Sequence, residues 1–210
     1  MIRNVIWDVD GTLFDTYPAI AAAFQSALAD LGKDAPLDWI VSLAKQSMGF
    51  CETTLAKQFQ LTEEEIDRKF DERYAQISYE DQPPFPGVAA ICDYICSIGG
   101  KNVIVTHRGK EGTAGLLAAH QLNGYFFAAI TNADGYPKKP APAAFDAALR
   151  DYGLKRAETI AVGDRDIDIL AGQAAGLFTC LFGAEIEGIS ADLIISNFEE
   201  LYGYIVAKNT

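Results

Sequence analysis

The chain has 210 residues, of which 50% are hydrophobic and 22% charged, so it is long enough for one sizeable core or a core with a small accessory domain. A formal net charge of −12 argues against nucleic acid or an anionic membrane as a partner, because both would repel this surface. No signal-peptide pattern and no apolar run of about 20 residues is present, so we expect a cytoplasmic protein. The oligomeric state stays open.

The first sixteen residues carry the most specific pattern. A short apolar run, Asn4 to Trp7, leads directly into Asp8-Val9-Asp10-Gly11-Thr12, and the predicted strand is Asn4–Val9. Because side chains alternate along a strand, Asp8 and Asp10 would share one face at its carboxyl end, where open α/β sheets bind ligands. Two crowded carboxylates repel each other, so an Mg²⁺ ion or a shared proton must relieve them. The pair could serve as nucleophile and general acid/base; the alternative is two solvated turn aspartates.

Residues 17–82 differ from the rest of the chain, because their apolar residues recur at helical spacing without a convincing strand. The predicted helices are Tyr17–Leu31, Leu37–Met48, Cys51–Phe59 and Glu63–Ile77. Thr62 before three glutamates is typical of a helix N-cap, and Pro83-Pro84-Phe85-Pro86 marks the end of the segment. We predict an all-helical cap, residues 17–82, that would hang over the ligand-binding end of the sheet and exclude water.

In residues 1–16 and 83–210, apolar strands alternate with amphipathic helices. After the first strand, the predicted strands are Asn102–Thr106, Phe126–Thr131, Thr159–Gly163, Phe178–Phe182 and Leu193–Ser196. The predicted helices are Gly87–Ile98, Lys110–Gln121, Pro142–Tyr152 and Asp166–Ala175. Repeated β-α units with short connections predict an α/β fold with a doubly wound, Rossmann-like parallel sheet. The cysteines, Cys51, Cys92, Cys96 and Cys180, lack metal-binding spacing, and we expect reduced packing roles for them.

Three consecutive polar residues lie at the end of the predicted strand Asn102–Thr106. Thr106 ends it, and a threonine in that place is uninformative by itself. His107 could contact a leaving group or be structural, and Arg108 is one of few cations near the predicted site, where it could contact substrate. A helix starting nearby would add its N-terminal dipole to phosphate binding.

Two further segments bring charge to the same edge of the sheet. Lys138-Lys139-Pro140 precedes a predicted helix, and a lysine there would offset the carboxylates and pair with phosphate. In Gly163-Asp164-Arg165-Asp166-Ile167-Asp168, Asp164 ends a strand and Asp168 lies one helical turn later on the same face. Asp166 is out of register and is interpreted as a helix-capping residue, while Arg165 is either exposed or substrate-facing.

Together, the Asp-x-Asp-Gly-Thr segment, Thr106, Lys139-Pro140 and the Gly-Asp-x-x-x-Asp segment resemble, in order, the four motifs of the haloacid dehalogenase superfamily of phosphohydrolases. The resemblance covers nearly the whole chain. It implies the subclass with a small helical cap after the first motif, which includes phosphoglycolate phosphatase and β-phosphoglucomutase.

The resemblance also implies roles for the residues. Asp8 and Asp164 would bind Mg²⁺ through their side chains and Asp10 through its backbone carbonyl, while Asp168 would ligate directly or orient a metal-bound water. Thr106 and nearby backbone N–H groups would hold phosphate oxygens, and Lys139 is selected over Lys138 because it directly precedes proline. The remaining candidates for substrate binding are Gly11, Thr12, His107, Arg108 and, in the cap, Met48, Gly49 and Phe50.

We therefore predict a Mg²⁺-dependent phosphatase that hydrolyses a small phosphorylated metabolite through an aspartyl-phosphate on Asp8, with Asp10 as acid and base. A sugar-phosphate mutase is the main alternative. The expected substrate-facing loop of the cap, Ser47-Met48-Gly49-Phe50, offers no cation for a second phosphate, and Lys45 is the nearest one. A non-catalytic binding domain on the same fold is the other alternative.

Overall fold

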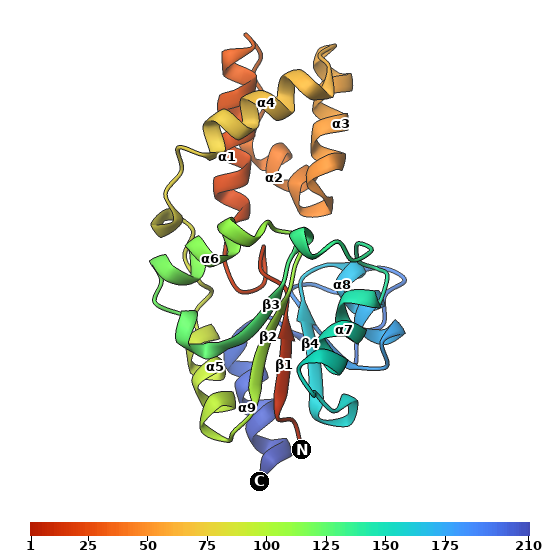
Figure 1. The fold of residues 1–210 in the computed structure, drawn as a ribbon. Helices are drawn as coiled ribbons and strands as arrows, with labels where there is room; N and C mark the ends of the chain where they lie inside the picture. The colour runs from red at the N-terminus through yellow and green to blue at the C-terminus, as the bar shows by residue number, and fades with distance from the viewer. The chain divides into compact units, whose positions relative to one another are not determined.

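The computed structural model describes residues 1–210, which form two compact units. Met1–Phe14 and Pro84–Thr210 make up the larger unit, and Asp15–Pro83 make up the smaller one (Figure 1). No helix is long and apolar enough to cross a membrane.

The larger unit is built on a six-stranded sheet in which every neighbouring pair is parallel, in the order β3-β2-β1-β4-β5-β6. The strands are β1 (Asn4–Trp7), β2 (Lys101–Val105), β3 (Phe126–Ile130), β4 (Thr159–Gly163), β5 (Phe178–Phe182) and β6 (Leu193–Ile195). The predicted α/β fold with a doubly wound parallel sheet is confirmed. Trp7 is in register with Ile104 of β2 and Val162 of β4, so the carboxyl ends of these three central strands lie together.

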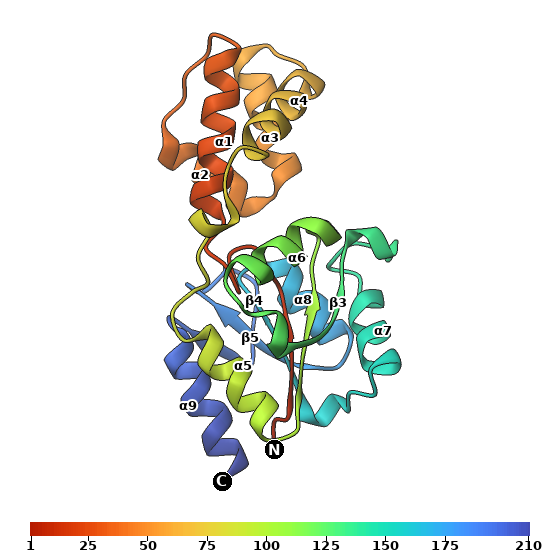
Figure 2. The ribbon, with the colours of Figure 1, turned by 60° about the vertical axis from the view of Figure 1, so that its left-hand side comes forward.

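Helices cover both faces of this sheet (Figure 2). They are α5 (Val88–Ser97), α6 (Lys110–Ala119), α7 (Ala143–Asp151), α8 (Asp166–Ala174) and α9 (Phe198–Asn209). Along β1, Val5 and Trp7 pack into the core with α5 and α9, whereas Ile6 packs into the core with α7 and α8. This alternation follows the two-residue period of a strand and explains why β1 is apolar on both faces.

The sequence analysis did not predict α9. Its signal is local: the Asn197 side chain accepts a hydrogen bond from the Glu200 N–H at 3.1 Å, and Glu200 accepts one from the Asn197 side-chain amide at 2.8 Å. An Asn-x-x-Glu pattern before an apolar segment is a helix-start signature. Short 3₁₀ turns complete the chain at Tyr79–Asp81, Asn123–Tyr125, Asn132–Asp134 and Arg156–Glu158.

The smaller unit contains four helices, α1 (Tyr17–Asp30), α2 (Leu37–Gln46), α3 (Met48–Phe59) and α4 (Glu63–Tyr74), and no strand. They enclose their own apolar core, in which the rings of Phe24 and Phe70 stack with centroids 4.3 Å apart. Thr62 caps α4 as expected: its hydroxyl accepts from the Glu65 N–H at 3.2 Å and Glu65 accepts from the Thr62 N–H at 2.9 Å.

One expectation for this unit is wrong. Met48, Gly49 and Phe50 do not form a loop, because they are the first turn of α3 and only Ser47 separates α2 from α3. The Ser47 hydroxyl accepts a hydrogen bond from the Phe50 N–H at 3.0 Å, so this serine acts as the helix N-cap.

All four cysteines are free thiols. Cys51, Cys92 and Cys180 are buried, and burial raises the pKa of the Cys51 and Cys180 thiols to about 12. Such thiols are unreactive apolar groups, which agrees with the packing role expected for the buried cysteines. Cys96 is exposed, so the packing role expected for it is wrong.

Candidate active site

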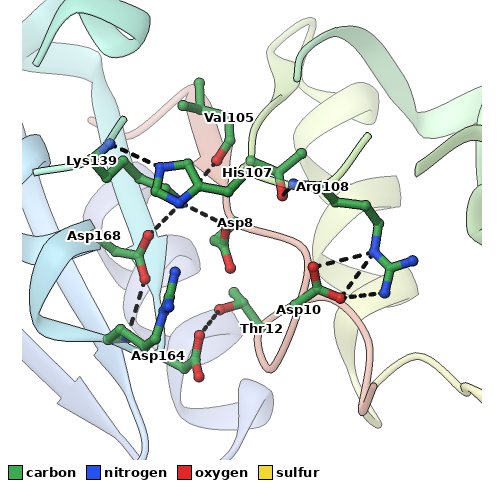
Figure 3. Close-up of polar contacts among 11 residues, drawn as sticks. Asp8, Asp10, Thr12, Val105, His107, Arg108, Lys139, Asp164 and Asp168 are labelled. Atoms are coloured by element: carbon green, nitrogen blue, oxygen red, sulfur yellow. Dashed lines mark hydrogen bonds and ion pairs between the residues drawn. The ribbon is translucent and has the colours of Figure 1, made fainter. Parts of the chain in front are cut away.

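The site lies at the carboxyl ends of β1, β2 and β4, where residues far apart in sequence meet (Figure 3). Asp8 follows β1, Thr106 follows β2 and Asp164 follows β4. Because β1 pairs with both β2 and β4, the sheet itself brings these three residues to one edge.

Lys139 occupies the centre of the site. Its Nζ lies 2.6 Å from Oδ1 of Asp8 and 2.5 Å from Oδ1 of Asp168, and it donates to the Val105 carbonyl at 3.2 Å. The Lys139 side chain is only 1% exposed. A lysine is buried this fully only when its charge is paired, and here three oxygen acceptors surround the ammonium. The Val105 carbonyl was not among the expected site groups.

Burial and charge act in opposite directions on these groups. Burial is the largest influence on Asp8 and raises the pKa of its carboxyl to about 6, although the charge of Lys139 opposes the rise. Burial by itself would lower the pKa of Lys139, but the neighbouring Asp168 and Asp8 carboxylates outweigh it and raise that pKa. Lys139 therefore stays positively charged next to Asp8, whose ionisation is disfavoured by burial.

Three carboxylates form a compact cluster. One oxygen from each of Asp8, Asp164 and Asp168 lies within 4.8 Å of the others, and the Thr12 hydroxyl donates to Asp164 at 3.1 Å. Even with Lys139 beside it, this cluster carries an excess of negative charge when all three acids are ionised. Carboxylate oxygens are the ligands that Mg²⁺ prefers, so the donor set fits a divalent cation of this kind.

Asp168 reaches the cluster because residue 163 is glycine. A Cβ atom on Gly163 would overlap the Asp168 side chain, lying 2.5 Å from its Cγ and 2.7 Å from its Oδ2. That Oδ2 also accepts a hydrogen bond from the Arg165 N–H at 3.1 Å, which fixes the carboxylate at the start of α8. Asp166 is exposed in the first turn of α8, where its side chain accepts from the Ile167 N–H at 2.8 Å; Arg165 holds the N-cap position expected for Asp166. Gly163 was part of the expected motif, but its steric role was not recognised.

Asp10 lies apart from the three-acid cluster and pairs with Arg108 (Figure 3). The guanidinium Nε donates to Oδ1 and Oδ2 of Asp10 at 2.9 and 3.2 Å, and Nη2 donates to Oδ1 at 2.6 Å. Gly11, next in the chain, has a φ of 78°, a conformation that glycine adopts without strain, and it turns the chain sharply after the strand. The Arg108 contact with Asp10 was not anticipated.

His107 is turned toward the backbone of Lys139. Its Nε2 accepts a hydrogen bond from the Lys139 N–H at 2.8 Å. Burial first, and then the positive charge of Lys139, lower the pKa of His107 to about 4, so the ring is neutral at physiological pH. In the same loop the Thr106 hydroxyl accepts from the Arg108 N–H at 3.1 Å, which leaves its proton available to another acceptor.

The structure thus gathers most of the candidate residues in the larger unit. Those gathered at the sheet edge are Asp8, Asp10, Gly11, Thr12, Thr106, His107, Arg108, Lys139, Asp164 and Asp168. Met48, Gly49 and Phe50 belong to the smaller unit. A cavity of about 70 Å³ adjoins Thr106, His107 and Lys139, but its lining includes none of the three clustered carboxylates.

Comparisons with known proteins agree with this arrangement. The sequence profile of the haloacid dehalogenase-like hydrolases matches residues 5–182. Phosphoglycolate phosphatase from Yersinia pestis is 30% identical over 216 residues, covering 95% of this chain and 91% of that protein. A hydrolase from Streptococcus pneumoniae is 32% identical with a TM-score of 0.67, covering 87% of this chain and 94% of its own. A Thermotoga maritima protein assigned as a β-phosphoglucomutase shares the fold, with a TM-score of 0.81, 18% identity and complete coverage of both chains.

Proposed function

Because this chain belongs to the haloacid dehalogenase-like hydrolase family and is a phosphatase of small phosphorylated compounds, we propose that it hydrolyses a phosphate monoester through an aspartyl-phosphate on Asp8, with Mg²⁺ as cofactor. The observation that carries the proposal is the central contact of Lys139, which places one buried ammonium against both Asp8 and Asp168. In the proposed mechanism Asp8 is the nucleophile, Lys139 is the charge-neutralising cation and Asp168 is one of the metal ligands.

In the first half-reaction, an Asp8 oxygen attacks phosphorus in line and the bond from phosphorus to the ester oxygen breaks. Asp10 gives its proton to that leaving oxygen, and Lys139 offsets negative charge on the transferring group. In the second half-reaction, Asp10 takes a proton from water as the water attacks the phosphorus and frees Asp8. A phosphate ion and an alcohol are the products.

The carboxylates of Asp8, Asp164 and Asp168, with the backbone carbonyl of Asp10, would hold the Mg²⁺ ion. When bound, the ion supplies further positive charge toward the phosphoryl oxygens. The Thr106 hydroxyl, with its proton available, and the backbone at Gly11 and Thr12 would contact the same oxygens. Met48, Gly49 and Phe50 of the helical unit are the proposed contacts for the leaving group.

Phosphoglycolate is the first substrate to test, because relatives of similar length bear the name phosphoglycolate phosphatase. Sugar and nucleotide monophosphates follow. A mutase of the β-phosphoglucomutase type is the second candidate, because such a protein shares the fold. Conversion of β-glucose 1-phosphate to glucose 6-phosphate would favour the mutase over the hydrolase.

The deciding experiment compares the protein with Asp8→Asn on p-nitrophenyl phosphate, with Mg²⁺ and with a chelator. We expect turnover that needs Mg²⁺ and falls by at least about 10³-fold in the variant, because the nucleophile is removed. Substantial Mg²⁺-dependent activity in Asp8→Asn would contradict the mechanism. No turnover by the folded protein on a broad panel of phosphate esters would instead favour a binding domain.

A further inference from the structure

The close pairing of Arg108 with Asp10 has no place in the roles described so far. The two residues are 98 positions apart, and the loop after β2 brings Arg108 to the segment after β1. Three hydrogen bonds join the guanidinium to the Asp10 carboxyl group. A planar guanidinium holds a carboxyl group in a defined plane, whereas a lysine would act only as a point charge.

Arg108 is itself held in place. Its side chain is 8% exposed, and its backbone N–H is tied to the Thr106 hydroxyl. Its side chain lies across Gly112 in α6, where a Cβ atom would sit 3.1 Å from Nη1 and 3.5 Å from Cδ. Glycine is a poor residue inside a helix, but here the missing side chain leaves the space that the arginine fills.

The two oxygens of Asp10 are not equivalent in this arrangement. Oδ1 accepts from both Nε and Nη2, at 2.9 and 2.6 Å, while Oδ2 accepts only from Nε, at 3.2 Å. The Asp10 side chain is 27% exposed, so without Arg108 its carboxyl group would be free to rotate. With Arg108 in place, Oδ1 accepts two hydrogen bonds, whereas Oδ2 accepts one at a longer distance, so Oδ2 has more room for a further partner.

We propose that Arg108, seated against Gly112, is a positioning residue that orients the Asp10 carboxyl group so that Oδ2 delivers its proton to the leaving oxygen. The proton moves from Oδ2 to that oxygen as the phosphorus–oxygen bond breaks, and Asp10 recovers it from the attacking water. This inference rests on the proposed function, in which Asp10 is the general acid and base.

The test uses two substrates of similar shape, phenyl phosphate and p-nitrophenyl phosphate, neither of which carries a charged substituent on its aromatic ring. Phenolate is the poorer leaving group and depends more on protonation, so a defect that acts through Asp10 must fall more heavily on phenyl phosphate. We expect kcat/KM of Arg108→Met to drop about tenfold more on phenyl phosphate than on p-nitrophenyl phosphate, in the pattern of Asp10→Asn. Arg108→Lys keeps the positive charge but lacks the planar guanidinium. We expect its kcat/KM on phenyl phosphate to lie between those of the wild type and Arg108→Met.

Gly112→Ala is the second variant, because its Cβ displaces Arg108 without removing it. We expect a loss of about threefold on phenyl phosphate and less on p-nitrophenyl phosphate, with Tm unchanged or raised because alanine favours the helix. Two matched controls should leave both substrates unaffected. Arg150→Met removes a surface arginine paired with Asp151, and Gly203→Ala fills a helical glycine with no neighbouring atom within 4 Å.

Equal losses on the two substrates in Arg108→Met and Gly112→Ala would overturn the inference, because they would mean that Arg108 acts on the phosphate or on folding. The Asp10→Asn variant distinguishes failure of the proposed role of Asp10 from failure of the inference about Arg108 alone. If its loss does not depend on the leaving group, the assigned role of Asp10 and the inference fail together. If its loss does depend on the leaving group while that of the Arg108 variants does not, only the inference fails. Should Arg108→Met not fold, Arg108→Lys and Gly112→Ala decide.

Discussion

His107 Nε2 accepts a hydrogen bond from the backbone N–H of Lys139 at 2.8 Å. This contact ties the loop after β2 to the segment whose side chain lies between Asp8 and Asp168. The ring nitrogen facing Lys139 is thus already engaged by the protein. The contact gives His107 a structural role beside the substrate contact expected from sequence.

We expect His107→Leu to lose about 1–2 kcal/mol of stability, because the Lys139 N–H is left without its acceptor. Activity should fall about tenfold or more as the Lys139 ammonium shifts within the site. His107→Gln places an amide oxygen near the position of Nε2 and should recover most of both losses. Urea denaturation and kcat on p-nitrophenyl phosphate measure the two effects. A glutamine variant as impaired as the leucine variant would argue against this role.

The same residue makes stability depend on pH. Burial and the charge of Lys139 lower the pKa of His107 from its ordinary 6.5 to about 4. The unfolded chain therefore binds a proton near pH 6.5 that the folded protein binds only near pH 4, so His107 costs stability as pH falls through this window. We expect the free energy of unfolding to drop more steeply between pH 7 and 5 in the wild type than in His107→Gln. Parallel curves for the two proteins would contradict the expectation.

Gly163 should be indispensable to the site. A Cβ atom on it would overlap the Asp168 side chain close to its root, where no rotamer change can remove the clash. We expect Gly163→Ala to displace Asp168 from Lys139, to lower activity by at least about 10²-fold and to destabilise the protein by about 2 kcal/mol. Gly203→Ala, at an uncrowded helical position, is the control and should cost nothing. A Gly163→Ala variant with normal kcat would show that Asp168 is not needed where it lies.

Sequence patterns predicted the strands and the sheet that carry this site better than the contacts between its side chains. The apolar run from Asn4 to Trp7 correctly predicted a buried strand directly before Asp8, and the order of the β-α units correctly predicted the parallel sheet. The partners were not predictable, because Asp8 and Asp10 lie two residues apart and yet pair with different cations from different loops. The cation that pairs with each aspartate depends on the paths of the loops and on side-chain rotamers. The spacing of apolar residues in the sequence does not predict either of them.

Two errors in the sequence analysis had local causes. The helix α9 was missed although Asn197 and Glu200 form a recognisable cap, because the apolar spacing that follows is weak. The first turn of α3 was mistaken for a loop between the two predicted helices Leu37–Met48 and Cys51–Phe59. There the capping hydrogen bond that the Ser47 hydroxyl accepts from the Phe50 N–H outweighs the poor helix propensity of Gly49.

Metal binding can be measured without turnover. The three clustered acids predict that Mg²⁺ stabilises the folded protein by about 2.7 kcal/mol at 100 times its Kd, which raises Tm. Asp164→Asn should abolish most of this shift. Asp166→Asn changes an exposed acid only two residues away, so the shift should remain, which makes it the matched control. Equal shifts in the two variants would mean that Asp164 does not hold the ion.

Substitution of Phe50 tests whether the helical unit contributes to substrate specificity. It lies in the first turn of α3 and is 45% exposed, so truncation should alter the free energy of unfolding by less than about 0.5 kcal/mol. If it contacts the leaving group, Phe50→Ala should change KM several-fold, and by different factors for phosphoglycolate and for a sugar phosphate. Leu37→Ala removes a comparably exposed apolar side chain from the first turn of α2 and is the matched control. The same KM values for wild type, Phe50→Ala and Leu37→Ala across the substrate panel would exclude Phe50 from the specificity site.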